Sequence, residues 1–109
     1  MSILLYRLVK HNPPLHEDMY SYKLLGIPLL AVSESRLWDG LSCYNTESQA
    51  RRRARSLHGY RFIAVLEIPE DGNVRYERTG RDRGHYTIWA DVEVLLRAVQ
   101  QVIPLEERM

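Results

Sequence analysis

The sequence contains little cysteine and no long hydrophobic run. Cys43 is the only cysteine among 109 residues, so no internal disulfide and no multi-cysteine zinc site can form. The longest apolar segments, Ile3–Val9 and Phe62–Leu66, are far shorter than the roughly 18 residues that a membrane-spanning helix needs. The N-terminus also lacks the basic region, apolar stretch and cleavage site of a secretory signal. We therefore expect a cytoplasmic protein that does not bind membranes.

Lysine is also scarce. Only Lys10 and Lys23 of the 15 basic residues are lysines, which leaves 13 arginines. Arginine suits carboxylates, phosphates and aromatic faces better than lysine does. The simpler explanation of the many arginines is a GC-rich genome, because arginine codons are rich in G and C. The formal net charge of +1 argues against nonspecific nucleic-acid binding as the main activity.

The composition is ordinary for a globular protein, at 45% hydrophobic and 27% charged residues, and predicts a single domain over residues 1–109. Apolar runs and turn residues predict strands at Ile3–Val9, Leu41–Asn45, Tyr60–Ile68, Val74–Arg78, His85–Ala90 and Val102–Leu105. Helices are expected over Glu17–Leu25, after the capping box that begins at Thr46, and after Asp91, with a loop over Ile27–Gly40. Because strands and helices do not alternate strictly, the fold class is α+β.

Arg7 is unusual because it lies within an apolar strand. Alternation places it on the strand face of Ile3, Leu5 and Val9. A buried arginine without a partner is strongly destabilising, so Arg7 must be paired or line a cleft. The sequence supports two interpretations equally: a structural ion pair with Glu67 or Glu77, and a role in binding a ligand.

Two strands carry polar side chains on one face. Ser42 and Tyr44, followed by Thr46, present three hydroxyls that could bind a ligand, although an edge strand facing water would look the same. His85 and Trp89 share a face of a later strand and could stack on a planar ring, although both are also typical structural residues.

Several kinds of site are excluded by the motifs that are missing. The four histidines show no metal-ligand spacing, so we expect no metal. No glycine-rich phosphate loop and no G-x-S-x-G motif is present. The run Arg51–Arg55 lies opposite the apolar side of its predicted helix, where it is either a solvated face or a guide for an anionic partner.

The order of these segments resembles that of the ADP-ribosyltransferase-like proteins. The resemblance rests on Leu5-Tyr6-Arg7 in the first strand, followed by the serine strand that runs into an alanine-bearing helix, Gly40-Leu-Ser-Cys-Tyr-Asn-Thr-Glu-Ser-Gln-Ala50. It is greatest with the bacterial toxin branch that uses an arginine, a serine and a late acidic residue, including the RES-type NAD-degrading toxins. It extends over most of the chain.

The resemblance implies a split, mostly antiparallel sheet with two to three short helices that holds NAD in a cleft. Arg7 would hold the dinucleotide, Ser42 would lie near the nicotinamide ribose, and Tyr44 would provide an aromatic surface for nicotinamide. Thr46, His85 and Trp89 are further candidates for contacts to NAD. The expected activity is cleavage of the glycosidic bond or transfer of ADP-ribose.

The sequence departs from this family at the last of the three functional residues, the late acidic one. The family places a glutamate on a late strand, whereas the late strand here begins His85-Tyr-Thr-Ile-Trp. Glu77 on the preceding strand is the nearest substitute, and Asp91 is better explained as a helix cap. The alternative function is therefore a non-catalytic interaction protein, inhibitor or antitoxin-like, that binds a protein partner through its arginine-rich helix face.

Overall fold

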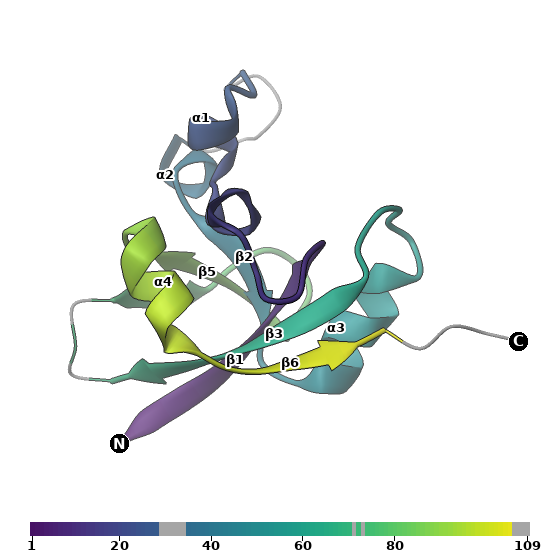
Figure 1. Ribbon diagram of the computed structural model, residues 1–109. Helices are drawn as coiled ribbons and strands as arrows, with labels where there is room; N and C mark the ends of the chain where they lie inside the picture. The colour runs from purple at the N-terminus through teal and green to yellow at the C-terminus, as the bar shows by residue number, and fades with distance from the viewer. Residues whose placement is uncertain (29–34, 71, 73, 106–109) are drawn as a thin grey trace, which may run out of the picture.

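A six-stranded antiparallel sheet forms the centre of the protein. The computed structural model describes residues 1–28, 35–70, 72 and 74–105. The strands are β1 (Ser2–Val9), β2 (Leu41–Tyr44), β3 (Phe62–Pro69), β4 (Arg75–Arg78), β5 (His85–Trp89) and β6 (Val99–Pro104). Their order across the sheet is β4-β5-β2-β1-β3-β6 (Figure 1). The α+β class is confirmed, and β1 is an interior strand, as its apolar side chains on both faces predict.

Helices lie on both faces of this sheet and at one end of the molecule. They are η1 (His16–Met19), α1 (Tyr22–Leu25), α2 (Ser35–Trp38), α3 (Glu47–Ala54) and α4 (Val92–Ala98). Leu95 of α4 packs with Leu5 and Val9 of β1, whereas Ala50 of α3 packs with Leu8 on the other face. Successive β1 side chains thus enter two different cores, because a strand points them alternately to the two faces.

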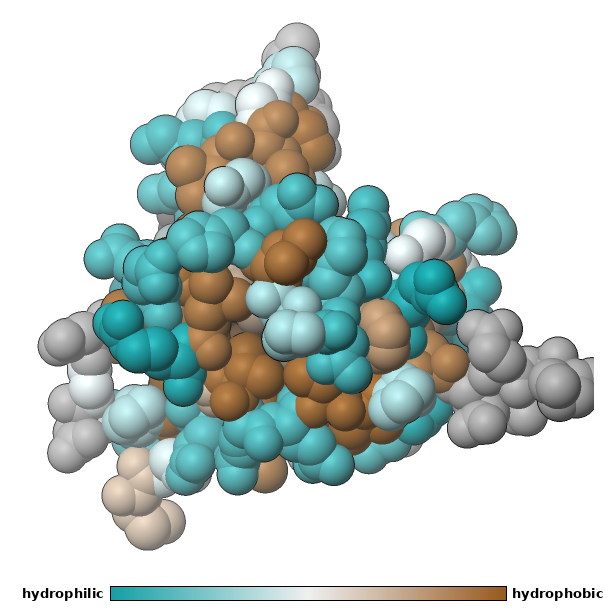
Figure 2. Space-filling model, in the orientation of Figure 1, coloured by the Kyte–Doolittle hydropathy of each residue, from teal (hydrophilic) through white to brown (hydrophobic). Residues whose placement is uncertain are grey.

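The helices α1 and α2 lie at one end of the molecule (Figure 1). Leu24 and Leu25 of α1 are more than half exposed, at 59% and 51%. An apolar patch is visible at the same end of the molecule in Figure 2. Within the described residues, no helix has the length and apolar character required to cross a membrane.

The sheet is nearly split between β1 and β2. β1 pairs with β3 along its whole length, from Ser2 opposite Pro69 to Val9 opposite Phe62. Its register with β2 consists of one pair, Tyr6 opposite Tyr44. The backbone hydrogen bonds between the two halves of the sheet are therefore few, and a cavity opens where β1 and β2 diverge.

Several element boundaries differ from those predicted. The helix expected over Glu17–Leu25 consists of two separate pieces, η1 and α1, and it ends as predicted at Gly26, whose φ is +79°. Ile27–Gly40 lies partly outside the described residues, and the described part contains α2 rather than loop alone. β6 begins at Val99, directly after α4, rather than at Val102. Propensity does not place this last boundary, because Gln100 and Gln101, which follow Val99, are as compatible with a continuing helix as with a strand.

Candidate functional site

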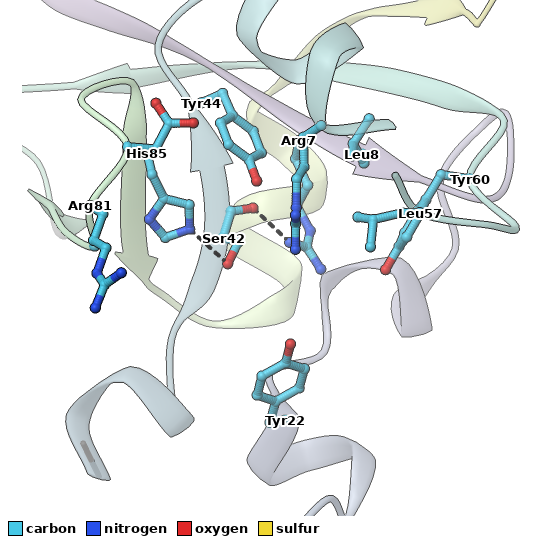
Figure 3. A pocket seen from close by; sticks show the side chains of 12 residues that line it. Arg7, Leu8, Tyr22, Ser42, Tyr44, Leu57, Tyr60, Arg81 and His85 are labelled. Carbon is cyan, nitrogen blue, oxygen red and sulfur yellow. Dashed lines mark hydrogen bonds between the residues drawn. The ribbon is translucent and has the colours of Figure 1, made fainter. Parts of the chain in front are cut away.

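A cavity of about 360 Å³ opens at the split between β1 and β2 (Figure 3). Its lining residues come from β1, β2, α1, α3, β5 and the two segments that precede β3 and β5. They include Arg7, Ser42, Tyr44, Arg53, Arg81 and His85. The volume lies within the range of roughly 300–1,000 Å³ that is typical of small-molecule sites.

Arg7 bridges the two halves of the sheet. It lies on the face of Leu5 and Val9 that alternation predicts, and its Nε donates to the main-chain oxygen of Asp18 at 2.9 Å. Its Nη1 donates to the main-chain oxygen of Ser42, also at 2.9 Å. A side chain thus supplies a hydrogen bond to β2 where the backbone of β1 has separated from it.

The structure does not show the ion pairs that were one interpretation of Arg7. Among the described residues, Glu67 accepts a hydrogen bond from Ser2, and Glu77 pairs with Arg75 at 2.8 Å. The observed acceptors of Arg7 are neutral carbonyl groups. Arg7 also lines the cavity, so a ligand bound there would lie close to its guanidinium group.

Asp18 fixes the segment that holds Arg7 in place. Asp18 is only 6% exposed, and its carboxylate accepts from the amides of Lys10 and Leu15 at 2.9 and 2.8 Å and lies 2.9 Å from Nδ1 of His11. These bonds close the turn after β1 and set the position of η1. The carbonyl group of Asp18 is thereby directed at the guanidinium of Arg7.

Ser42 and His85 are joined by a hydrogen bond within the cavity. The distance from Ser42 Oγ to His85 Nε2 is 3.0 Å (Figure 3). On the other side of the ring, Nδ1 of His85 lies 3.1 Å from the carbonyl oxygen of Thr79 and 3.0 Å from its Oγ1. Thr79 Oγ1 in turn lies 2.7 Å from Thr87 Oγ1, and both threonines are buried. The ring of His85 is therefore held from both sides.

Tyr44 forms a wall of the cavity. It is 6% exposed, and its ring meets that of His85 edge to face, with centroids 5.4 Å apart. Burial raises the pKa of the Tyr44 hydroxyl above its usual value, and the charge and hydrogen bond of Arg53 oppose that rise. The phenol consequently stays neutral and can contact a planar ring.

The cavity favours negatively charged ligands. Three arginines line it, Arg7, Arg53 and Arg81, against one carboxylate, Asp82. Guanidinium groups bind phosphate and carboxylate oxygens through paired hydrogen bonds. The arrangement thus suits a ligand that carries both an anionic group and a planar ring.

The structure places the other predicted site residues elsewhere. Thr46 caps α3 by accepting from the amide of Gln49 at 3.1 Å, and the guanidinium carbon of Arg75 lies 4.5 Å from the ring centroid of Trp89. Glu77 is not part of the cavity lining. Arg7, Ser42, Tyr44 and His85 come together, whereas Thr46, Glu77 and Trp89 do not join them.

The sequence interpretation also missed residues of the site. Arg53 belongs to a run that was interpreted as a helix face in contact with solvent or a partner, and Arg81 and Asp82 lie in a polar loop to which no role was assigned. The polar loop from Thr79 to Gly84 could have indicated these residues. The loop leads directly into β5, so it must lie beside β2 if β5 pairs with β2. That pairing is long-range, and a local pattern does not reveal it.

Comparisons with family models, with curated proteins and with solved structures find no match to this chain. The resemblance to the ADP-ribosyltransferase-like proteins therefore stays a prediction. Among the described residues, no group of three histidine, cysteine or acidic side chains is arranged to hold a metal ion.

Proposed function

We propose that this chain is an ADP-ribosyltransferase-like domain that binds NAD in the cavity at the split of the sheet. The observation that carries the proposal is the position of Arg7, whose guanidinium crosses from β1 to Ser42 of β2 and lines the cavity. The resemblance implies the same three features, namely a split sheet, a first-strand arginine and a second-strand serine.

In this proposal the two halves of NAD meet different parts of the cavity. The nicotinamide ring lies against Tyr44, and its ribose lies near Ser42. The arginines of the cavity bind the diphosphate, because their positive charges lie beside the anionic part of the ligand. Cleavage of the glycosidic bond develops positive charge on the ribose, which an oriented carboxylate stabilises.

The carboxylate assigned to that step changes from the one that the sequence suggested. Glu77 pairs with Arg75 and lies outside the cavity lining, whereas Asp82 lines the cavity. Asp82 accepts from the amide of Gly84 at 3.0 Å, which orients one of its oxygens. Asp82 therefore replaces Glu77 as the acid that acts in glycosidic cleavage or ADP-ribose transfer.

The test measures NAD binding and nicotinamide release by the purified protein. We expect NAD to raise the melting temperature of the wild type, and Arg7→Met to abolish both that increase and the release of nicotinamide. Arg97→Met is the matched control, because Arg97 is an exposed arginine of α4 outside the cavity lining. Equal inertness of the wild type and Arg7→Met, with no change of melting temperature on adding NAD, would refute the proposal.

A second candidate function rests on the surface of α3 and of the residue that follows it, Arg55. Arg52, Arg53 and Arg55 are exposed there, whereas Arg51 pairs with Glu47 at 2.8 Å. A non-catalytic interaction protein would use these exposed arginines to bind an acidic partner. Reversing the charge of Arg52 and Arg55, which do not line the cavity, would then abolish association and leave NAD binding unchanged.

A further inference from the structure

We propose that Ser42 is a nucleophile activated by His85, and that it attacks phosphorus in an anionic phosphate ester. The inference concerns the cavity of the proposed function, but it does not require that NAD bind there. It starts from the series of hydrogen bonds from Ser42 through His85 to Thr79. Nucleophile, base and orienting group in hydrogen-bond contact are the pattern of an activated serine.

The hydrogen bonds assign the tautomer of His85. The main-chain oxygen of Thr79 can only accept, so the His85 nitrogen that faces it at 3.1 Å, Nδ1, carries the proton. In a neutral imidazole, the other nitrogen then has a free lone pair. Nε2 is that nitrogen, and it lies 3.0 Å from Ser42 Oγ. The ring therefore accepts the proton of the serine hydroxyl, as a general base must.

The hydroxyl of Ser42 is also accessible to a ligand. Ser42 is exposed and lines the cavity, and its main chain is held by Arg7. Thr79 and Thr87 are buried, and their hydroxyls bond to each other. Ser42 thus combines a positioned base with access from the cavity.

The charge of the cavity determines the class of electrophile. Arg7, Arg53 and Arg81 line the cavity, and a phosphoryl group carries negative charge on oxygens that match guanidinium geometry. The same arginines stabilise the charge that these oxygens bear during attack. We therefore assign a phosphate ester as the substrate class.

The reaction proceeds in two steps. Ser42 Oγ forms a bond to phosphorus, and the bond from phosphorus to the leaving group breaks with its electron pair on the leaving group. The hydroxyl proton moves to Nε2 of His85 and then to the leaving group. Water next attacks phosphorus and gives a proton to His85, which returns it to Oγ as the oxygen–phosphorus bond breaks.

The first step is tested with an alkyl fluorophosphonate, which forms the bond from Oγ to phosphorus, releases fluoride and stops there. The wild-type protein is incubated with this probe without NAD, and the modified residue is located by peptide mass spectrometry. We expect modification at Ser42 and none at Ser48, an exposed serine of α3. A wild-type protein that is unmodified at Ser42, or modified equally at both serines, would overturn the proposal.

Variants test the role of His85. His85→Ala should slow labelling at least about 100-fold, the lower range of a general base, and added imidazole should restore part of the rate. Ser48→Ala is the control and should label at the wild-type rate. Far-ultraviolet circular dichroism confirms that each variant is folded. Undiminished labelling of folded His85→Ala would overturn the role of the histidine as base.

Two competitors separate this inference from the proposed function. Inorganic phosphate should slow labelling of Ser42, because it occupies the arginine-lined part of the cavity, and no protection by phosphate would contradict the substrate class. NAD should slow labelling only if it binds the same cavity. Labelling that phosphate slows and NAD does not affect would therefore support the activated serine and count against NAD binding.

Discussion

Arg7 is the residue whose replacement tests the structure most directly. Arg7→Met removes the guanidinium and keeps an unbranched side chain of similar reach. The variant loses the hydrogen bonds to the carbonyl oxygens of Asp18 and Ser42, both 2.9 Å long. These bonds connect η1 and β2 to β1, which has one register pair with β2. Their loss should therefore weaken contact between the two halves of the sheet.

The expected loss of stability follows from the number and exposure of these bonds. A hydrogen bond that involves a charged group contributes about 1.5–3 kcal/mol when it is well buried. Arg7 is only partly buried, so water from the cavity can reach both carbonyl groups in the variant. We therefore expect Arg7→Met to lower the free energy of unfolding by about 1–3 kcal/mol in total. This loss is a substantial share of the total free energy of unfolding of a typical domain, which is roughly 5–15 kcal/mol.

Urea denaturation followed by circular dichroism measures this difference. We expect a lower midpoint at an unchanged slope, and a melting temperature that falls by at least about 4 °C. Arg97→Met should stay within about 0.5 kcal/mol of the wild type, as is usual for a surface substitution. If Arg7→Met is as stable as Arg97→Met, the guanidinium does not connect the sheet halves and the reasoning is refuted.

Two further predictions concern Cys43, which is buried, and Gly40, which is partly buried. Burial raises the pKa of the Cys43 thiol from 9.0 to about 11, against the opposing charge of Arg7, so the unfolded chain ionises first as the pH rises. Between these two pH values, the free energy of unfolding of the wild type should therefore fall by up to about 3 kcal/mol more than that of Cys43→Ala. Urea denaturation at both pH values measures the difference, and an equal fall in the two proteins would contradict the prediction. A Cβ on Gly40 would overlap the methyl group of Thr87 and lie 2.9 Å from Nε1 of Trp89. Gly40→Ala should consequently lower the free energy of unfolding by about 1–3 kcal/mol in the same assay, and an unchanged value would show that the site has room.

Local sequence patterns predicted the strands better than the short helices. The run from Ile3 to Val9 has apolar side chains on both faces, and β1 is interior with a core on each side. The segment from Glu17 to Leu25 has helical composition, but the buried carboxylate of Asp18 binds amides at Lys10 and Leu15. That tertiary network holds a 3-10 turn before α1, and propensity contains no information about it.

Part of the site was visible in the sequence, because strand alternation assigns faces. The shared face of Ser42 and Tyr44 follows from their spacing. The contact of His85 with Ser42 does not, since it depends on β2 pairing with β5, in the register Ser42 opposite Thr87. The position of Arg53 in the cavity depends on how α3 packs against β1 and β2, which a charge pattern on a helix leaves open.

The most direct measurement of the central claim is a titration of the ¹⁵N-labelled protein with NAD, followed by amide chemical shifts. If NAD binds in the cavity, we expect saturable shifts at Ser42, Tyr44 and His85, which line it, and much smaller shifts at Thr46 and Trp89, which do not. Saturable shifts confined to residues outside the cavity, or none at all, would contradict it.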